Sequence, residues 1–146
     1  MTMINLAIIV GLLLGSDLVA RAGGASPALA GRIALGAVFL FTALGHFLKT
    51  AEMAEMLPSS VPQRRLIIRL SGVLELAMAA AVIPAPFSRA AGLAICAFLL
   101  LATPANVFAA WRRIPFGGHA RGPAYLALRL PLQALLFGWA YWFTLR

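Results

Sequence analysis

The sequence predicts an all-α membrane protein: a four-helix transmembrane bundle with an additional N-terminal transmembrane helix, five helices in total, forming one domain over residues 1–146. Hydrophobic residues make up 62% of the chain and charged residues only 11%, and the mean hydropathy is +0.94. A soluble fold of this size could not cover so much apolar surface. The apolar residues also fall into continuous runs instead of alternating with polar ones, which argues against strands.

The apolar runs have the length of membrane-spanning helices. Each holds about 18–23 residues, as a hydrocarbon core about 30 Å thick requires at a rise of 1.5 Å per residue. Turn-forming stretches separate them, namely GGASPALAG, PSSVP, PAP and IPFGGHARGP. The predicted helices are residues 3–21, 31–49, 65–84, 89–111 and 124–146.

The first predicted helix is expected to stay at the periphery of the bundle. No basic residue precedes its apolar stretch, so a membrane segment is favoured over a cleaved signal peptide. Asp17 and Arg21 lie four residues apart on this helix and are expected to pair. Gly11 and Gly15 have the spacing of a helix-dimer face, although such pairs are common by chance.

The basic residues indicate a membrane surface and an orientation. Twelve Lys and Arg residues against four acidic ones give a net charge of +8. They stand singly or in pairs at the ends of apolar runs, which suits anionic headgroups and argues against a nucleic-acid partner. The N terminus and the second and fourth connections share the more basic side, which the positive-inside rule places in the cytoplasm. Its basic residues are Lys49, Arg64, Arg65, Arg112, Arg113 and Arg121.

The cysteine content limits the chemistry that the chain can perform alone. Cys96 is the single cysteine, so no internal disulfide forms. The sequence also has no Cys/His cluster of the kind that holds zinc, an iron–sulfur centre or a c-type haem. We therefore expect no metal and no covalently bound cofactor, and interpret Cys96 as a packing residue.

Four of the predicted helices carry polar side chains at helical spacing, so each has one polar face. An ionised side chain at the centre of a membrane helix costs about 2.5–3.5 kcal/mol. Glu75 and Arg129 are therefore expected to face each other inside the bundle, in a polar cavity with Glu75 at its floor. The polar stripes are Thr42, His46 and Lys49; Ser71 and Glu75; Cys96, Thr103 and Asn106; and Tyr125, Arg129 and Gln133.

Two further features border the predicted cavity. Pro104 and Pro131 interrupt helices and free backbone carbonyls, which either shapes the cavity or only kinks the helices. Residues 51–62 form a short amphipathic segment over its mouth, either a connector that rests on the headgroups or a gate.

The polar pieces, taken in order over about residues 31–146, resemble the DoxX-like family of small bacterial membrane proteins. The resemblance implies a four-helix bundle in a multi-pass protein of the bacterial inner membrane, with the 3–21 helix as an addition. The matching pieces are GHF at 45–47, Met-Leu-Pro and a second proline within 56–62, SGVLEL at 71–76, PANVFAA at 104–110 and LRLPLQ at 128–133. The family's polar motif positions fall on His46, Glu75, Asn106, Arg129 and Gln133, which are the expected ligand-binding residues.

Three functions stay open. The first is a redox-associated subunit that binds a quinone or another lipid-soluble molecule beside a partner oxidoreductase, with Glu75 and His46 as candidate catalytic residues that exchange a proton. The second is a non-catalytic ligand-binding, chaperone or assembly protein. The third is a small transporter, which would need a homo-oligomer because the chain is short and has no inverted repeat. A polar core that only fixes helix register is the alternative to all three.

Overall fold

The structure is a computed structural model that describes residues 2–146, with side chains described from residue 4 onward. This part of the chain is helical and contains no strand. The all-helical fold class predicted from the sequence is therefore confirmed. The elements in order are α1 (Thr2–Ala22), α2 (Pro27–Leu48), α3 (Thr50–Ala54), α4 (Arg64–Ala81), α5 (Ala85–Trp111), the 3-10 helix η1 (His119–Tyr125), α6 (Leu126–Ala140) and the π-helix η2 (Tyr141–Leu145).

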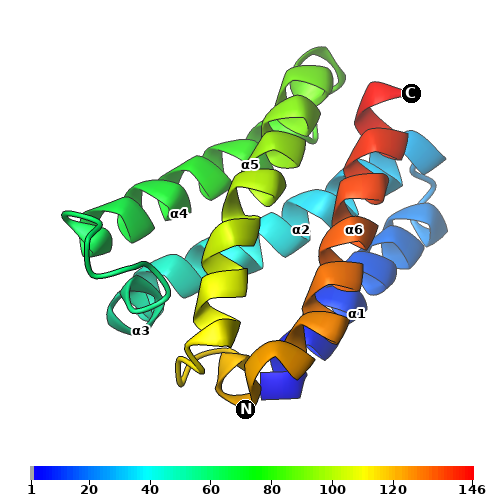
Figure 1. The fold of residues 1–146 in the computed structure, drawn as a ribbon. Coiled ribbons are helices and arrows are strands. Elements are labelled where there is room, and N and C mark those ends of the chain that lie inside the picture. Colours follow the sequence, from blue (N-terminus) through cyan, green and yellow to red (C-terminus); the bar gives the residue numbers. More distant parts are fainter. Residues whose placement is uncertain (1) are drawn as a thin grey trace.

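The helices form two layers with α2 at the centre. α1 and α4 pack along either side of α2, and α5, η1, α6 and η2 pack across them as the second layer. The N terminus, α3 and η1 lie at one end of the bundle, while the C terminus and the α4–α5 turn lie at the other (Figure 1). This arrangement puts the more basic connections together, as the sequence predicts.

Local capping moves two helix starts away from the predicted positions. α2 begins before residue 31, because the Ser26 hydroxyl accepts a hydrogen bond from the Leu29 amide at 3.3 Å and Pro27 occupies the first turn. α5 begins at Ala85 instead of residue 89, since Pro86 also lies in a first turn, where a missing N–H group costs nothing. The prolines that were expected to break the chain therefore start helices.

Three helices of the described chain, α1, α2 and α5, are long and apolar enough to cross a membrane. The five predicted transmembrane helices are thus borne out only in part. α4 has the length but carries three arginines and Glu75 within its 18 residues. α6 changes to a π-helix at Tyr141, although the helical chain continues without a break to Leu145.

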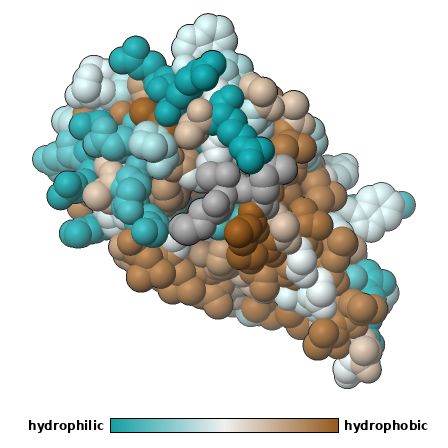
Figure 2. Space-filling view, turned by 90° about the horizontal axis from the view of Figure 1, so that it is seen from below, coloured by the Kyte–Doolittle hydropathy of each residue, from teal (hydrophilic) through white to brown (hydrophobic). Residues whose placement is uncertain are grey.

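The bundle has an apolar core and a largely apolar outer surface. Cys96 is buried in the core, as predicted for a packing residue. Figure 2 shows hydrophilic residues gathered on the side where α3 lies and hydrophobic residues over most of the remaining face. Large apolar side chains are exposed on each long helix, for example Leu18, Leu48, Leu70, Leu101 and Leu135.

The segment that precedes α4 is amphipathic, as predicted, but little of it is helical. Only Thr50–Ala54 forms a helix, after which Met56 is buried and Glu55 is exposed. Arg64 at the start of α4 donates a hydrogen bond to the carbonyl of Leu57 at 3.3 Å. The segment is thereby tied to α4 at the basic end of the bundle.

Candidate functional site

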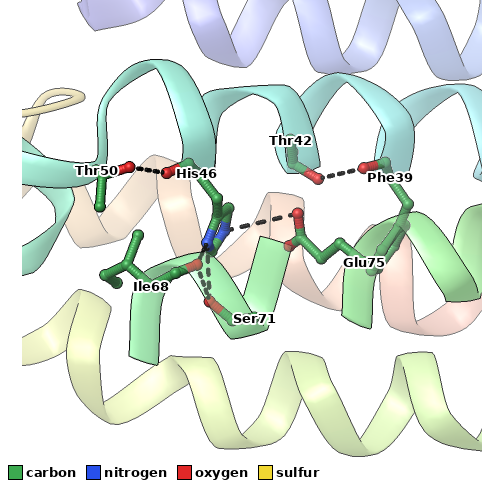
Figure 3. A network of polar contacts seen from close by, with 7 residues as sticks. All are labelled: Phe39, Thr42, His46, Thr50, Ile68, Ser71 and Glu75. Atoms are coloured by element: carbon green, nitrogen blue, oxygen red, sulfur yellow. Dashed lines mark hydrogen bonds and ion pairs between the residues drawn. The ribbon is translucent and has the colours of Figure 1, made fainter. Parts of the chain in front are cut away.

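His46 and Glu75 form a buried pair between α2 and α4. Nε2 of His46 lies 3.6 Å from Oε2 of Glu75, and the two side chains point toward each other across the helix interface (Figure 3). The residues are only 8% and 4% exposed. Oε2 of Glu75 is shielded from solvent and has no hydrogen-bond partner among the described residues. At 3.6 Å the contact with His46 is an ion-pair distance that is longer than a hydrogen bond, so the imidazole is the group nearest to this buried oxygen that can donate to it.

Gly72 allows the two helices to approach closely enough for this pair to form. A Cβ atom added to Gly72 would lie 2.7 Å from Cβ of His46 and 3.1 Å from the ring of Phe47. Gly72 and Glu75 are three residues apart and therefore share one face of α4. The same face that permits the contact also presents the carboxylate to His46.

The hydrogen bonds of His46 determine which nitrogen carries its hydrogen. Nδ1 lies 2.9 Å from the carbonyl oxygen of Ile68 and 2.8 Å from Oγ of Ser71, whose hydroxyl donates to the same carbonyl at 2.8 Å. Both neighbours of Nδ1 therefore act as acceptors, so Nδ1 carries the hydrogen. Nε2 is left to share one further proton with Glu75.

A second polar group joins α5, η1 and α6. Nε of Arg129 donates to Oδ1 of Asn106 at 3.2 Å, and Nε2 of His119 lies 3.2 Å from the same oxygen. Asn106 in turn donates to the carbonyl of Ala102 at 2.9 Å, which fixes the orientation of its amide. Asn106 and His119 are 4% and 3% exposed, so both side chains are buried next to Arg129.

His119 is held by the loop that precedes η1. Its Nδ1 lies 2.7 Å from the carbonyl oxygen of Phe116, and its ring packs edge-on against Tyr125 with centroids 5.0 Å apart. Burial lowers the pKa of His119, the Phe116 carbonyl acts in the opposite direction, and the charge of Arg129 lowers it again. A neutral imidazole carries one ring hydrogen, so it donates to only one of its two oxygen neighbours.

Gln133 forms a third contact, between α6 and α5. Its amide nitrogen donates to the carbonyl of Leu99 and to the hydroxyl of Thr103. Its carbonyl oxygen is buried without a hydrogen-bond partner in the described part of the chain. Gln133 therefore links the two helices one turn beyond Arg129.

The structure distributes the predicted ligand-binding residues over three separate groups. Among the described residues, no hydrogen bond or ion pair connects the His46–Glu75 pair with Asn106, Arg129 or Gln133. The expected pairing of Glu75 with Arg129 is corrected: Glu75 faces α2, and Arg129, in the first turn of α6, faces α5 and η1. Polar stripes predict which face of a helix turns inward, but the neighbour that this face meets depends on how the helices cross.

His119 is the functional candidate that sequence reasoning missed. It lies in the glycine- and proline-rich connection before the last helix, where a lone histidine gives no periodic signal. Gly118, with φ of 122°, and Gly122, with φ of 76°, allow this connection to turn the ring back toward α5. Only the loop geometry therefore brings His119 to Asn106.

Two shallow grooves run along helix surfaces, and neither is lined by His46 or Glu75. The first follows α5 from Leu100 to Arg112 and includes Thr103. The second follows α1 and includes Gly11 and Gly15, where an added Cβ would meet nothing within 4 Å. Asp17 on the same helix pairs with Arg21 at 2.7 Å, as predicted.

A family model described as Domain of unknown function (DUF8561) matches residues 35–144. The match contains all three polar groups and excludes α1. It overturns the resemblance to the DoxX-like family. The pieces behind the resemblance are short runs of three to seven residues. No curated protein and no solved structure matches the chain.

Proposed function

We propose that this chain, which belongs to the DUF8561 family of unknown function, is a multi-pass membrane protein whose His46–Glu75 pair exchanges a proton with a lipid-soluble molecule of the quinone class. The observation that carries the proposal is the buried Oε2 of Glu75, which faces Nε2 of His46 and has no hydrogen-bond partner among the described residues. The proton donor or acceptor that completes this site then comes from a ligand.

The surface of the bundle supports a multi-pass placement in the cell inner membrane. Leu70, Val73 and Leu74 are exposed on α4 even though arginines precede them, so this helix also presents an apolar face. The helical chain from Leu126 to Leu145 is about 30 Å long at 1.5 Å per residue, which matches a hydrocarbon core. The end that holds α3 and η1 is proposed to be cytoplasmic, since it has more basic residues.

The shared proton makes the pair suited to exchange with a bound molecule. When Nε2 of His46 and the carboxylate of Glu75 share one proton, the pair is neutral overall. If the pair gains or loses a proton, it carries a net charge in a medium of low dielectric constant. That charge costs several kcal/mol. A quinone oxygen supplies the missing acceptor, and a hydroquinone hydroxyl supplies the missing donor. The electrons of the reduction would come from a partner oxidoreductase.

A lipid-soluble molecule has a short route to the pair. Phe47 follows His46 in α2, packs over Gly72 and is 41% exposed at the surface of the bundle. Leu44 on α2 and Leu74 on α4 are also exposed. Displacement of the Phe47 ring would open the α2–α4 interface to the surrounding lipid without a path through water.

The test is binding of decylubiquinone to the purified full-length protein in detergent. Quenching of tryptophan fluorescence measures the binding. We expect Glu75→Gln to bind at least about tenfold more weakly, since it removes the shared proton at nearly constant volume. Glu55→Gln is the matched control, because Glu55 is an exposed carboxylate paired with Arg64. Equal affinity of the wild type and Glu75→Gln would refute the proposal.

The close packing at Gly72 favours a second candidate, a ligand-binding or assembly protein without chemistry, in which the pair only fixes α4 against α2. The two functions differ in proton exchange. Reduction of bound decylubiquinone by added dithionite supplies two electrons and takes up two protons, so slower reduction in Glu75→Gln than in the wild type at equal quinone occupancy supports the first. Loss of thermal stability in Glu75→Gln, with equal reduction rates in the two proteins, supports the second.

A further inference from the structure

Arg129 forms no ion pair with a carboxylate among the described residues, and of the four acids only the charge of Glu75 acts on its guanidinium from a distance. The sequence holds four acidic residues, and none follows Glu75, so α5, η1, α6 and η2 contain no acid. The structure pairs each acid with a different base. The pairs are Asp17 with Arg21 at 2.7 Å, Glu52 with Lys49 at 3.2 Å, Glu55 with Arg64 at 3.7 Å and Glu75 with His46 at 3.6 Å.

Within the described part of the chain, the guanidinium of Arg129 is held by one hydrogen bond, and its other donors are free. Only its Nε donates to the protein, to Oδ1 of Asn106, and the two terminal nitrogens have no acceptor among the described residues. Asn106 is fixed from its other side by the carbonyl of Ala102, so it holds the guanidinium in one position. The terminal nitrogens present a planar pair of donors, the arrangement that binds two oxygens of one anion.

Tyr125 adds a neutral donor next to the guanidinium. It precedes Arg129 by four residues, so the two side chains share one face of the helical chain. The ring is held against His119 and is 4% exposed, while its hydroxyl has no hydrogen-bond partner in the described part of the protein. Arg129 and Tyr125 together therefore offer several N–H and O–H groups and no acceptor with negative charge.

The surroundings of Arg129 favour an anion at the membrane surface. Arg112, Arg113 and Arg121 belong to the connection at this end of the bundle, and the guanidinium of Arg113 lies against Gly122. Basic residues in this connection raise the local concentration of anions. Headgroups lie at this depth when the bundle spans a membrane.

The groove along α5 runs toward the end of the bundle that holds this donor group. Its lining includes Leu100, Thr103 and Trp111, and it ends at Arg112. Thr103 accepts a hydrogen bond from Gln133, which lies one turn beyond Arg129 on α6. The groove thus borders the Gln133–Thr103 contact between α5 and α6, one helical turn from Arg129.

We infer that Arg129 and Tyr125, held in place by Asn106 and His119, form a binding site for a phosphate group, supplied by an anionic phospholipid or by free phosphate. The site shares with the proposed function only the placement of the bundle in a membrane. It uses neither His46 nor Glu75, so either proposal can fail alone.

The test is binding to the full-length protein in dodecylmaltoside, measured as the increase in melting temperature at rising concentrations of three probes. The probes are phosphatidylglycerol and phosphatidylcholine in mixed micelles, and inorganic phosphate. A response to phosphatidylglycerol that exceeds the response to phosphatidylcholine identifies a lipid headgroup, and a response to inorganic phosphate identifies free phosphate. No response to phosphatidylglycerol or phosphate in the wild type overturns the inference.

Variants show whether the response arises at this site. Arg129→Gln is expected to weaken binding at least about tenfold, because it removes one charge-assisted bidentate contact with the phosphate group. Arg89→Gln, which removes an equal charge from the opposite end of the bundle, is expected to bind as the wild type does. Glu75→Gln is also expected to retain binding. Equal binding by Arg129→Gln and the wild type overturns the inference.

Tyr125→Phe keeps the inference testable if Arg129→Gln does not fold. This change removes only the hydroxyl, and the ring still packs against His119. Binding is expected to weaken roughly two- to tenfold, as loss of one hydrogen bond predicts. Unchanged affinity in Tyr125→Phe would then count against the site.

Discussion

Gly72 controls how closely α4 approaches α2, and its replacement tests the packing around the His46–Glu75 pair. In Gly72→Ala the new Cβ would lie 2.7 Å from Cβ of His46, a backbone-near atom that cannot move without shifting a helix. We expect a loss of stability of about 1–3 kcal/mol, the usual cost of overpacking. Thermal unfolding in detergent, followed by tryptophan fluorescence, measures it.

Gly45→Ala is the matched control for this change. Gly45 lies in α2 next to His46, and a Cβ added there would meet nothing within 4 Å. Because alanine has the higher helix propensity, we expect stability to stay constant or to rise by up to about 1 kcal/mol. Similar losses in the two variants would show that Gly72 has no special contact.

At the scale of elements, η1 places an ionisable ring in the bundle, and its protonation affects stability. Burial lowers the pKa of His119 in the folded protein, whereas the unfolded chain has the ordinary value of about 6.5. The unfolded state therefore binds more protons just below pH 6.5. The free energy of unfolding is expected to be fully retained above about pH 6.5 and to fall as the pH decreases below it.

His119→Gln tests this pH dependence, since glutamine does not titrate. Melting temperatures measured between pH 7.5 and pH 5.5 are expected to fall less in His119→Gln than in the wild type. Both proteins retain His46, so the difference between the two slopes reports on His119. Identical slopes would mean that His119 has the same proton affinity in the folded and unfolded chains.

At the scale of the whole molecule, α3 and the α4–α5 turn lie at opposite ends of the bundle (Figure 1). We therefore expect them on opposite sides of the membrane. Single cysteines test this in a Cys96→Ala background. A membrane-impermeant maleimide is expected to label Ala85→Cys in intact cells and Glu52→Cys only in inverted vesicles. Both residues are exposed at the protein surface. Labelling of both from one side would contradict the topology, and the reverse pattern would contradict the proposed orientation.

The sequence by itself determined the helical fold class, the apolar outer surface and the residues that turn inward. Continuous apolar runs admit few structures other than helices, and a polar residue at helical spacing avoids lipid whatever its neighbours are. Buried Glu75, Asn106 and Gln133 were predicted on these grounds. Helix starts were less accurate, because the same proline can end one helix or begin the next.

Only the tertiary structure decided which polar groups meet. Glu75 pairs with His46 and not with Arg129, because Gly72 lets α4 pack closely on α2 while the start of α6 packs on α5 and η1. His119 reaches Asn106 only because glycines with positive φ turn its loop inward. Helical periodicity fixes the direction of a side chain on its own helix, but partners depend on helix crossing and loop conformation, which involve contacts distant in sequence.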